Sequence, residues 1–153
     1  MDDQVKGFWE RFLETTGRHE DTPCYSVFHF ELTKELADSL LELVLSGKKT
    51  ATAGSLNAYE IEGERLPEVG DLSVVTDFLG NPRCVIETSQ VTLIPFKEMT
   101  YDICSREGED DDLSSWQRGH ERFFRDEGRE MGYEFHEDMV VVFEDFKVVH
   151  KET

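Results

Sequence analysis

The chain has 153 residues, of which 38% are hydrophobic and 11% aromatic, and this composition is ordinary for a folded domain and excludes a disordered protein. Its formal net charge of -18 disfavours a protein that coats DNA or RNA, because binding to a phosphate backbone depends on Lys and Arg. A small ligand, or one locally basic pocket, is compatible with this charge.

Cysteine usage and the N-terminal sequence predict a cytoplasmic protein. Cys24, Cys84 and Cys104 are far apart and odd in number, which is typical of reduced thiols rather than of a disulfide framework. The first residues lack the basic and apolar regions of a signal peptide, and no apolar run approaches the roughly 20 residues that span a bilayer. With no repeat or linker in the sequence, we expect a single domain over residues 1–153 and no membrane partner.

The first third of the chain predicts two helices with a short strand between them. The spacing of apolar residues predicts a helix from Asp2 or Asp3 to Gly17, followed by a strand within residues 24–30. Thr33 is the expected N-cap of a second helix, which has a broad apolar face.

The second helix should end at Gly47, and two lysines and two threonines follow it directly. The simpler interpretation of Lys48 and Lys49 is that they complement the negative end of the helix dipole. The functional interpretation is that this junction presents the amine of Lys49 and the hydroxyl of Thr52 together. In a straight strand these two side chains would lie on opposite faces, so they can meet only if the chain turns near Lys49 and Thr50.

The middle of the chain predicts a loop and an antiparallel hairpin. Residues 57–68 are polar without a clear period and are expected to form a long exposed loop. Residues 72–78 and 83–94 predict two strands, and the alternation of the second shifts phase between Ile86 and Val91, which indicates a bulge.

The last third predicts a short helix over 100–106, an acidic run over 107–112 and a long helix that ends at Gly132. A final strand is expected over 139–149, with a polar interruption at Glu144-Asp145. Helices around a strand-rich middle indicate an α+β fold with a mostly antiparallel sheet or small barrel.

The segment Gly47-Lys48-Lys49-Thr50-Ala51-Thr52 resembles the ASCH domain family, a branch of the PUA-like superfamily. Further landmarks agree with a bacterial branch of that family: Phe8-Trp9, Phe12-Leu13, Leu66-Pro67-Glu68-Val69-Gly70-Asp71, Glu107-Gly108-Glu109, Trp116, His120 and Phe123-Phe124. The resemblance covers residues 5 to 149. It implies a PUA-like, small, mostly antiparallel β-barrel with helices packed at its rim.

The resemblance also implies a function. Relatives have been linked to RNA-related roles, including ribonuclease activity, and one branch of small proteins removes acetyl groups from acetylated cytidine nucleosides. In that branch a lysine, a threonine three residues later and a distant glutamate carry the reaction, and these correspond to Lys49, Thr52 and Glu107. This chain departs from the pattern at Gly54 and Ser55, where many members have an arginine after the threonine.

Amide hydrolysis needs a nucleophile, a base and a donor for the oxyanion. Thr52 supplies an alcohol, and Lys49 could be its base only as a neutral amine, which a second cation such as Lys48 would favour. Glu107 could orient the lysine or move a proton, but a carboxylate beside Lys49 would keep it charged.

Other residues could bind the substrate. Tyr25 and Trp116 could stack on a nucleobase, although packing explains Trp116 equally well, and Lys48 could contact the ligand. His120 lies beside Trp116 on its helix and could be either an acid–base group or a hydrogen-bonded core residue. The acidic run lacks the spacing of a calcium loop, and we expect neither a metal nor a cofactor.

We therefore expect a hydrolase that acts on a modified nucleoside such as acetylated cytidine. Two alternatives stay open: an RNA-binding module or ribonuclease, and a non-catalytic binder of a nucleotide-like ligand. The sequence gives no indication of the oligomeric state.

Overall fold

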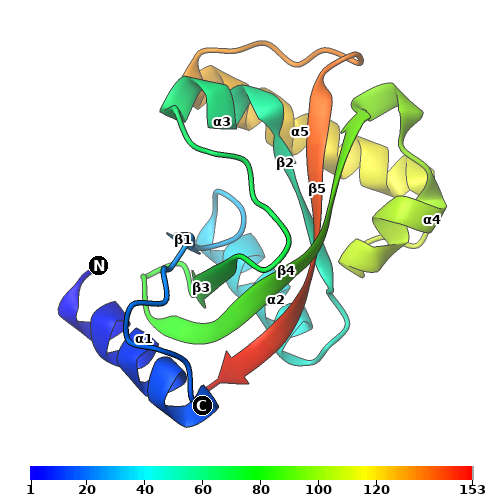
Figure 1. Cartoon of the computed structure of the whole chain (residues 1–153). Coiled ribbons are helices and arrows are strands. Elements are labelled where there is room, and N and C mark those ends of the chain that lie inside the picture. The colour runs from blue at the N-terminus through cyan, green and yellow to red at the C-terminus, as the bar shows by residue number, and fades with distance from the viewer. Residues whose placement is uncertain (153) are drawn as a thin grey trace.

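The computed structural model describes residues 1–152, and its centre is one five-stranded sheet in the order β1-β3-β4-β5-β2. The pair β1·β3 is parallel and the other three pairs are antiparallel. The strands curl into a half-barrel with helices around it, an α+β, PUA-like arrangement (Figure 1). Their bounds are Ser26–Phe28 for β1, Ala51–Ser55 for β2, Leu72–Thr76 for β3, Pro82–Pro95 for β4 and Val140–Lys151 for β5.

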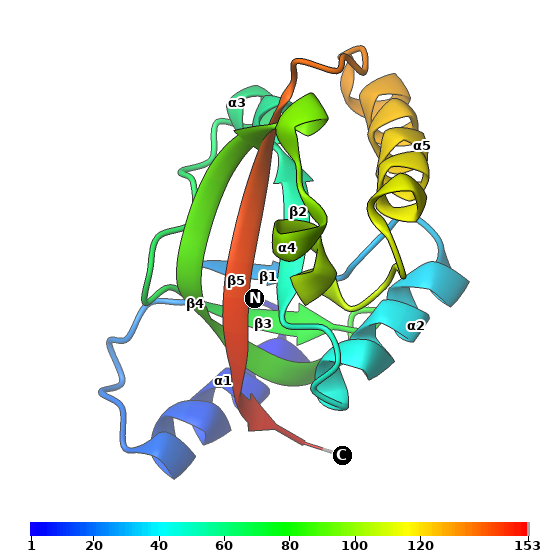
Figure 2. The same cartoon turned by 90° about the vertical axis from the view of Figure 1, so that its right-hand side faces the viewer.

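The two long strands β4 and β5 carry the curvature of the sheet. Thr88 pairs with Phe146 and Gln90 pairs with Asp145, so Ser89 is an extra residue in β4. The phase shift expected between Ile86 and Val91 is thereby confirmed as a bulge, the irregularity that bends a strand and increases its twist. Figure 2 shows β4 bending along β5.

Two helices lie near one end of the half-barrel. The helix α1 (Asp3–Thr16) is capped by the Asp2 side chain and ends at Gly17, as predicted, and it packs Phe8 and Phe12 on β3 and β4. The helix α2 (Lys34–Leu45) begins at the predicted cap Thr33, and its apolar face packs on the same two strands and β5.

The other end of the half-barrel is covered by α5 (Leu113–Met131). Its buried residues Trp116 and Phe124 pack against Phe96 and Phe143 in one apolar cluster. A short α4 (Tyr101–Cys104) and the 3-10 turns η1 (Phe96–Glu98) and η2 (Ser105–Glu107) connect β4 to this helix.

Two predictions were wrong. The expected loop over 57–68 begins with a helix, α3 (Leu56–Glu62), whose first turn is capped by the Ser55 hydroxyl and whose last turn is closed by Gly63 at φ 67°. The expected interruption of the last strand is absent, because Glu144 and Asp145 continue β5 as buried residues. A partner compensates for the burial of each carboxylate: the Thr88 hydroxyl donates to Glu144, and Arg106 forms an ion pair with Asp145.

The cysteines agree with the sequence interpretation, since Cys24, Cys84 and Cys104 are all free thiols. Burial raises the pKa of Cys84 to about 12 and that of Cys104 to about 11, which keeps both thiols protonated. Across residues 1–152, no helix has the length and apolarity that crossing a bilayer requires.

Candidate functional site

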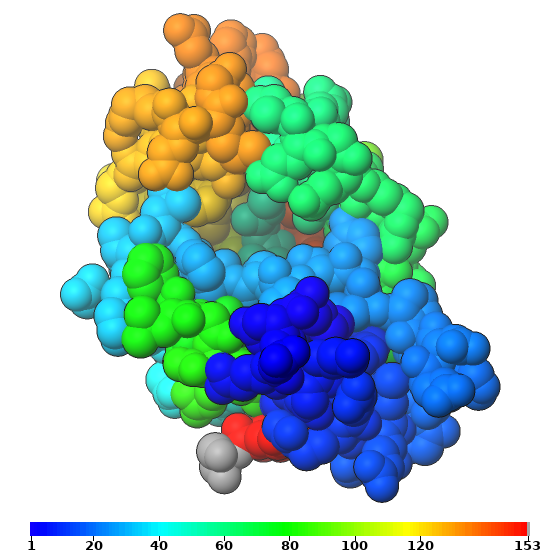
Figure 3. Space-filling view, turned by 90° about the vertical axis from the view of Figure 1, so that its left-hand side faces the viewer, coloured from blue at the N-terminus to red at the C-terminus, as the bar shows by residue number. Residues whose placement is uncertain are grey.

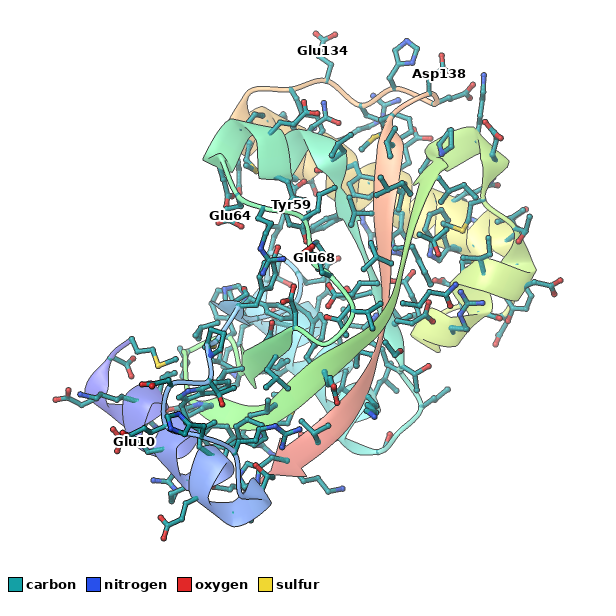
Figure 4. All side chains as sticks on the ribbon, in the orientation of Figure 1. Glu10, Tyr59, Glu64, Glu68, Glu134 and Asp138 are labelled. Atoms are coloured by element: carbon teal, nitrogen blue, oxygen red, sulfur yellow. The ribbon has the colours of Figure 1, made fainter. Side chains whose placement is uncertain are left out.

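A cavity of about 620 Å³ opens between the sheet and the helices α2, α3 and α5. In the space-filling view it is a hollow whose floor is formed by β2 and β5 (Figure 3). Residues from β1, β2 and β5 line it on the side of the sheet, and residues from α5 and the segment before it line the opposite side. Tyr59 projects from α3 towards this space (Figure 4).

A turn at the end of α2 leads into the segment that lines the cavity. Gly47 has φ 82°, and the main-chain amides of Lys48 and Lys49 both donate to the carbonyl of Leu43, at 2.9 and 3.0 Å. The chain bends at Lys48, and β2 begins only at Ala51. Lys49 therefore precedes the strand, and the alternation of strand faces does not dictate where its side chain points.

Lys49 is buried, with 2% of its surface exposed, and three acceptors surround its ammonium group. Its Nζ lies 2.7 Å from the carbonyl oxygen of Ala51, 2.5 Å from Oε2 of Glu109 and 3.4 Å from Oε1 of Glu107. An ammonium group has three hydrogens to donate, so this geometry fits the charged form. It therefore opposes the hypothesis that Lys49 acts as a general base.

Glu107 is the centre of a second set of contacts. The indole Nε1 of Trp116 donates to its Oε2, and Nε2 of His120 lies 3.1 Å from the same oxygen. Burial alone would raise the pKa of Glu107, but Lys49, His120 and the indole N–H outweigh it and bring the pKa to about 2. Glu107 is therefore ionised at neutral pH.

Both ring nitrogens of His120 face acceptors. Nδ1 lies 2.9 Å from the carbonyl oxygen of Trp116, and Nε2 faces Glu107. Burial would lower the pKa of His120, but the charge of Glu107 raises it above its ordinary value. The ring stacks on Trp116 at 4.1 Å between centroids and 16° between planes. His120 thus balances the charge of Glu107.

Glu109 belongs to the site, although the sequence interpretation did not include it. It reaches Lys49 because Gly108 adopts a left-handed conformation with φ 69°. The main chain of Gly108 packs against that of Lys48, and a Cβ added to Gly108 would lie 2.2 Å from the carbonyl oxygen of Lys48. Burial and the neighbouring Glu107 raise the pKa of Glu109 despite its contact with Lys49. A glycine between two acidic residues was the signal in the sequence that both could turn towards one partner.

Thr52 lies on β2 directly opposite Glu144 on β5. Directly opposed residues of an antiparallel pair project from the same face of the sheet, and both residues line the cavity. Burial raises the pKa of Glu144, and Thr88 donates a hydrogen bond of 2.6 Å to its Oε2. Glu144 was interpreted from the sequence only as a break in the strand, so its place in the cavity was missed.

The structure brings five of the seven candidate site residues to one cavity. Its lining includes Lys49, Thr52, Glu107, Tyr25 and His120. The remaining two lie elsewhere. Trp116 is fully buried and its indole N–H donates to Glu107, whereas Lys48 is exposed and is not among the lining residues. A ligand in this cavity would therefore contact neither of them.

The ASCH domain family matches residues 26–150 of the chain. Two solved structures resemble nearly all of it: an ASCH domain from Lactobacillus crispatus JV V101 (36% identity, 97% of this chain and 96% of that one, TM-score 0.88) and a protein from Enterococcus faecalis V583 (33% identity, 97% and 90%, TM-score 0.88). A third, a hypothetical protein with 19% identity, covers 83% of this chain and 100% of its own, with a TM-score of 0.52, and it resembles the chain in fold alone. The chain has no significant match among curated proteins.

Proposed function

The chain belongs to the ASCH domain family, and we propose that it hydrolyses the amide bond of an acylated nucleoside, with acetylated cytidine as the most concrete substrate. One observation carries the proposal: the buried ammonium group of Lys49, with its three hydrogen-bond acceptors, and the hydroxyl group of Thr52 line the same cavity. Thr52 is the nucleophile in this proposal. The contact of Lys49 with Glu107, at 3.4 Å, is the longest of its three, and in this proposal Lys49 turns that hydrogen to the developing oxyanion while Glu109 and the carbonyl of Ala51 hold the ammonium group in place.

The charge of the cavity supports a nucleoside rather than a nucleotide or RNA. Its cationic lining residues include Lys49 and Arg122, whereas the acidic ones include Glu31, Glu62, Glu64, Glu109, Glu127 and Glu144. A phosphate group would meet this excess of negative charge in addition to a net charge of -18. A neutral nucleoside would not be repelled by this charge.

The size and aromatic lining of the cavity support the same choice. About 620 Å³ lies within the range of roughly 300–1,000 Å³ that is typical of small-molecule sites. Tyr25, Phe28, Phe30 and Tyr59 are among its lining residues and provide apolar surface on which a base or sugar can pack.

The test is to incubate the protein with acetylated cytidine and with its 5′-phosphate, and to follow the release of cytidine or its phosphate. We expect turnover of the nucleoside and much weaker turnover of the phosphate. Thr52→Val should reduce kcat by roughly 10³-fold or more. The matched control is Thr92→Val, which changes a threonine of β4 outside the cavity lining and should keep full activity.

Two other outcomes would contradict the proposal. Full activity of Thr52→Val would exclude this threonine as the nucleophile. Stabilisation of the fold by acetylated cytidine without turnover would identify a binding protein, the alternative that the aromatic lining also favours.

A further inference from the structure

We infer that Glu144 is the catalytic base of this site, which takes the proton from Thr52 and passes it to the leaving amine. The inference rests on the proposed function, because it assigns a role within that reaction. The nucleophile needs a base, and the amine of Lys49 does not offer one, because three hydrogen-bond acceptors surround its nitrogen.

The position of Glu144 follows from the register of β2 and β5. Thr52 and Glu144 are directly opposed in this antiparallel pair, so their Cβ atoms are about 4.5–5.5 Å apart on one face. A threonine hydroxyl and a glutamate carboxylate can meet across that distance, either directly or through one water molecule. Both side chains line the cavity, so a substrate carbonyl can approach the same place.

The cluster around Lys49 lies at the edge of β2 that faces away from β5. The amide of Phe146 donates to the carbonyl of Thr50, which directs the carbonyl of Thr50 towards β5. Because strand carbonyls alternate in direction, the carbonyl of Ala51 points away from β5, to the free edge of β2, and there it accepts from Lys49. The carboxylates of Glu107 and Glu109 are therefore committed to the ammonium at this free edge, whereas Glu144 lies next to Thr52.

The surroundings of Glu144 suit a proton acceptor. Burial raises its pKa, Asp71 adds a smaller effect in the same direction, and the hydrogen bond from Thr88 opposes them. The other titratable groups that face it are two phenols, Tyr25 and Tyr59, whose pKa values are raised and which stay neutral. A carboxylate with a raised pKa is a stronger base than an ordinary one.

The reaction balances with one water molecule. As the oxygen of Thr52 bonds to the acyl carbon, its proton moves to Glu144 and the carbonyl electrons form the oxyanion. Collapse of this intermediate breaks the carbon–nitrogen bond, and the proton on Glu144 goes to the leaving amine. Water then attacks the threonine ester and gives its proton to Glu144, which returns that proton to Thr52 as the carboxylic acid leaves.

The first experiment compares Glu144→Gln with Glu87→Gln on acetylated cytidine. Glutamine keeps an oxygen that can accept from Thr88 but cannot take a proton, so kcat should fall by about 10² to 10⁴-fold while KM changes only a few-fold. Glu87 lies on β4, pairs with Lys147 outside the cavity lining and should be replaceable without loss. Wild-type kcat in Glu144→Gln would overturn the inference and leave the proposed function intact.

The second experiment uses Thr88→Val and the pH profile of kcat/KM. The Thr88 hydrogen bond lowers the pKa of Glu144, so its removal should raise that pKa and move the acidic limb of the profile to higher pH. Merely structural damage would lower the whole profile without moving the limb, and that result would also overturn the inference. If the wild-type protein turns over no acylated nucleoside, the proposed function fails and the role of Glu144 fails with it.

Discussion

Replacing Lys49 by methionine keeps the length of the side chain but removes the charge that Glu107 and Glu109 share. The side chains of these three residues are 1%, 2% and 18% exposed, so water can replace the lost ammonium only in part. Removing one partner of a buried ion pair typically costs about 3–5 kcal/mol, because the other charge is left uncompensated. We therefore expect Lys49→Met to lose about this much free energy of unfolding at neutral pH.

The loss should depend on pH in a defined direction. In the wild type, the pKa of Glu107 is lowered from 4.5 to about 2, so its stabilising contribution is complete above the ordinary value and disappears as the pH falls through about 2. Without Lys49 the pKa of Glu107 rises, and the carboxyl takes up its proton at higher pH. The difference between the two proteins should therefore shrink as the pH falls below about 4.5.

Urea unfolding of both proteins between about pH 3 and pH 7 measures these differences. The matched control is Lys48→Met, a neighbouring lysine that is exposed and should be replaceable with little change. A loss below about 1 kcal/mol, or one that is equal at both ends of the pH range, would refute the view that this cluster is a buried, mutually compensated set of charges.

Two further variants test the same cluster. Glu107→Gln removes the charge that raises the pKa of His120, so an NMR titration should show that pKa falling relative to the wild type. An unchanged titration would show that Glu107 does not control His120. Gly108→Ala places a Cβ against the main chain of Lys48 at positive φ and should cost roughly 2 kcal/mol or more, whereas Gly119→Ala, within α5 and facing open space, should be neutral or gain up to about 1 kcal/mol. Equal stabilities of the two glycine variants in thermal unfolding would contradict the close packing at residue 108.

Local patterns in the sequence predicted those elements whose apolar residues face the core. The helices α1 and α5 have a regular apolar stripe, and their ends at Gly17 and Gly132 follow from the tolerance of glycine for positive φ. The helix α3 was missed because none of its residues is fully buried, so it has no apolar stripe. Its cap at Ser55 and its closing Gly63 were the available signals.

The site was less predictable because it depends on contacts between distant segments. The family resemblance pointed to Lys49, Thr52 and Glu107, but the register that sets Thr52 opposite Glu144 is a property of the assembled sheet. The two acidic residues in β5 looked like a break because buried carboxylates are rare in strands. Their partners, Thr88 and Arg106, are 56 and 39 residues away in the sequence.

The contact between Lys49 and the carbonyl of Ala51 has a consequence for self-association. β2 is an edge strand, and an uncovered edge is a template on which a second chain can add a strand. The ammonium of Lys49 occupies one of the outward-facing acceptors of this edge, with two carboxylates beside it. The neighbouring amide of Thr50 donates to the carbonyl of Arg106 at 3.0 Å, and Lys49 and Ala51 are both buried, so the segment 105–109 closes this edge of β2 against strand addition by a second chain.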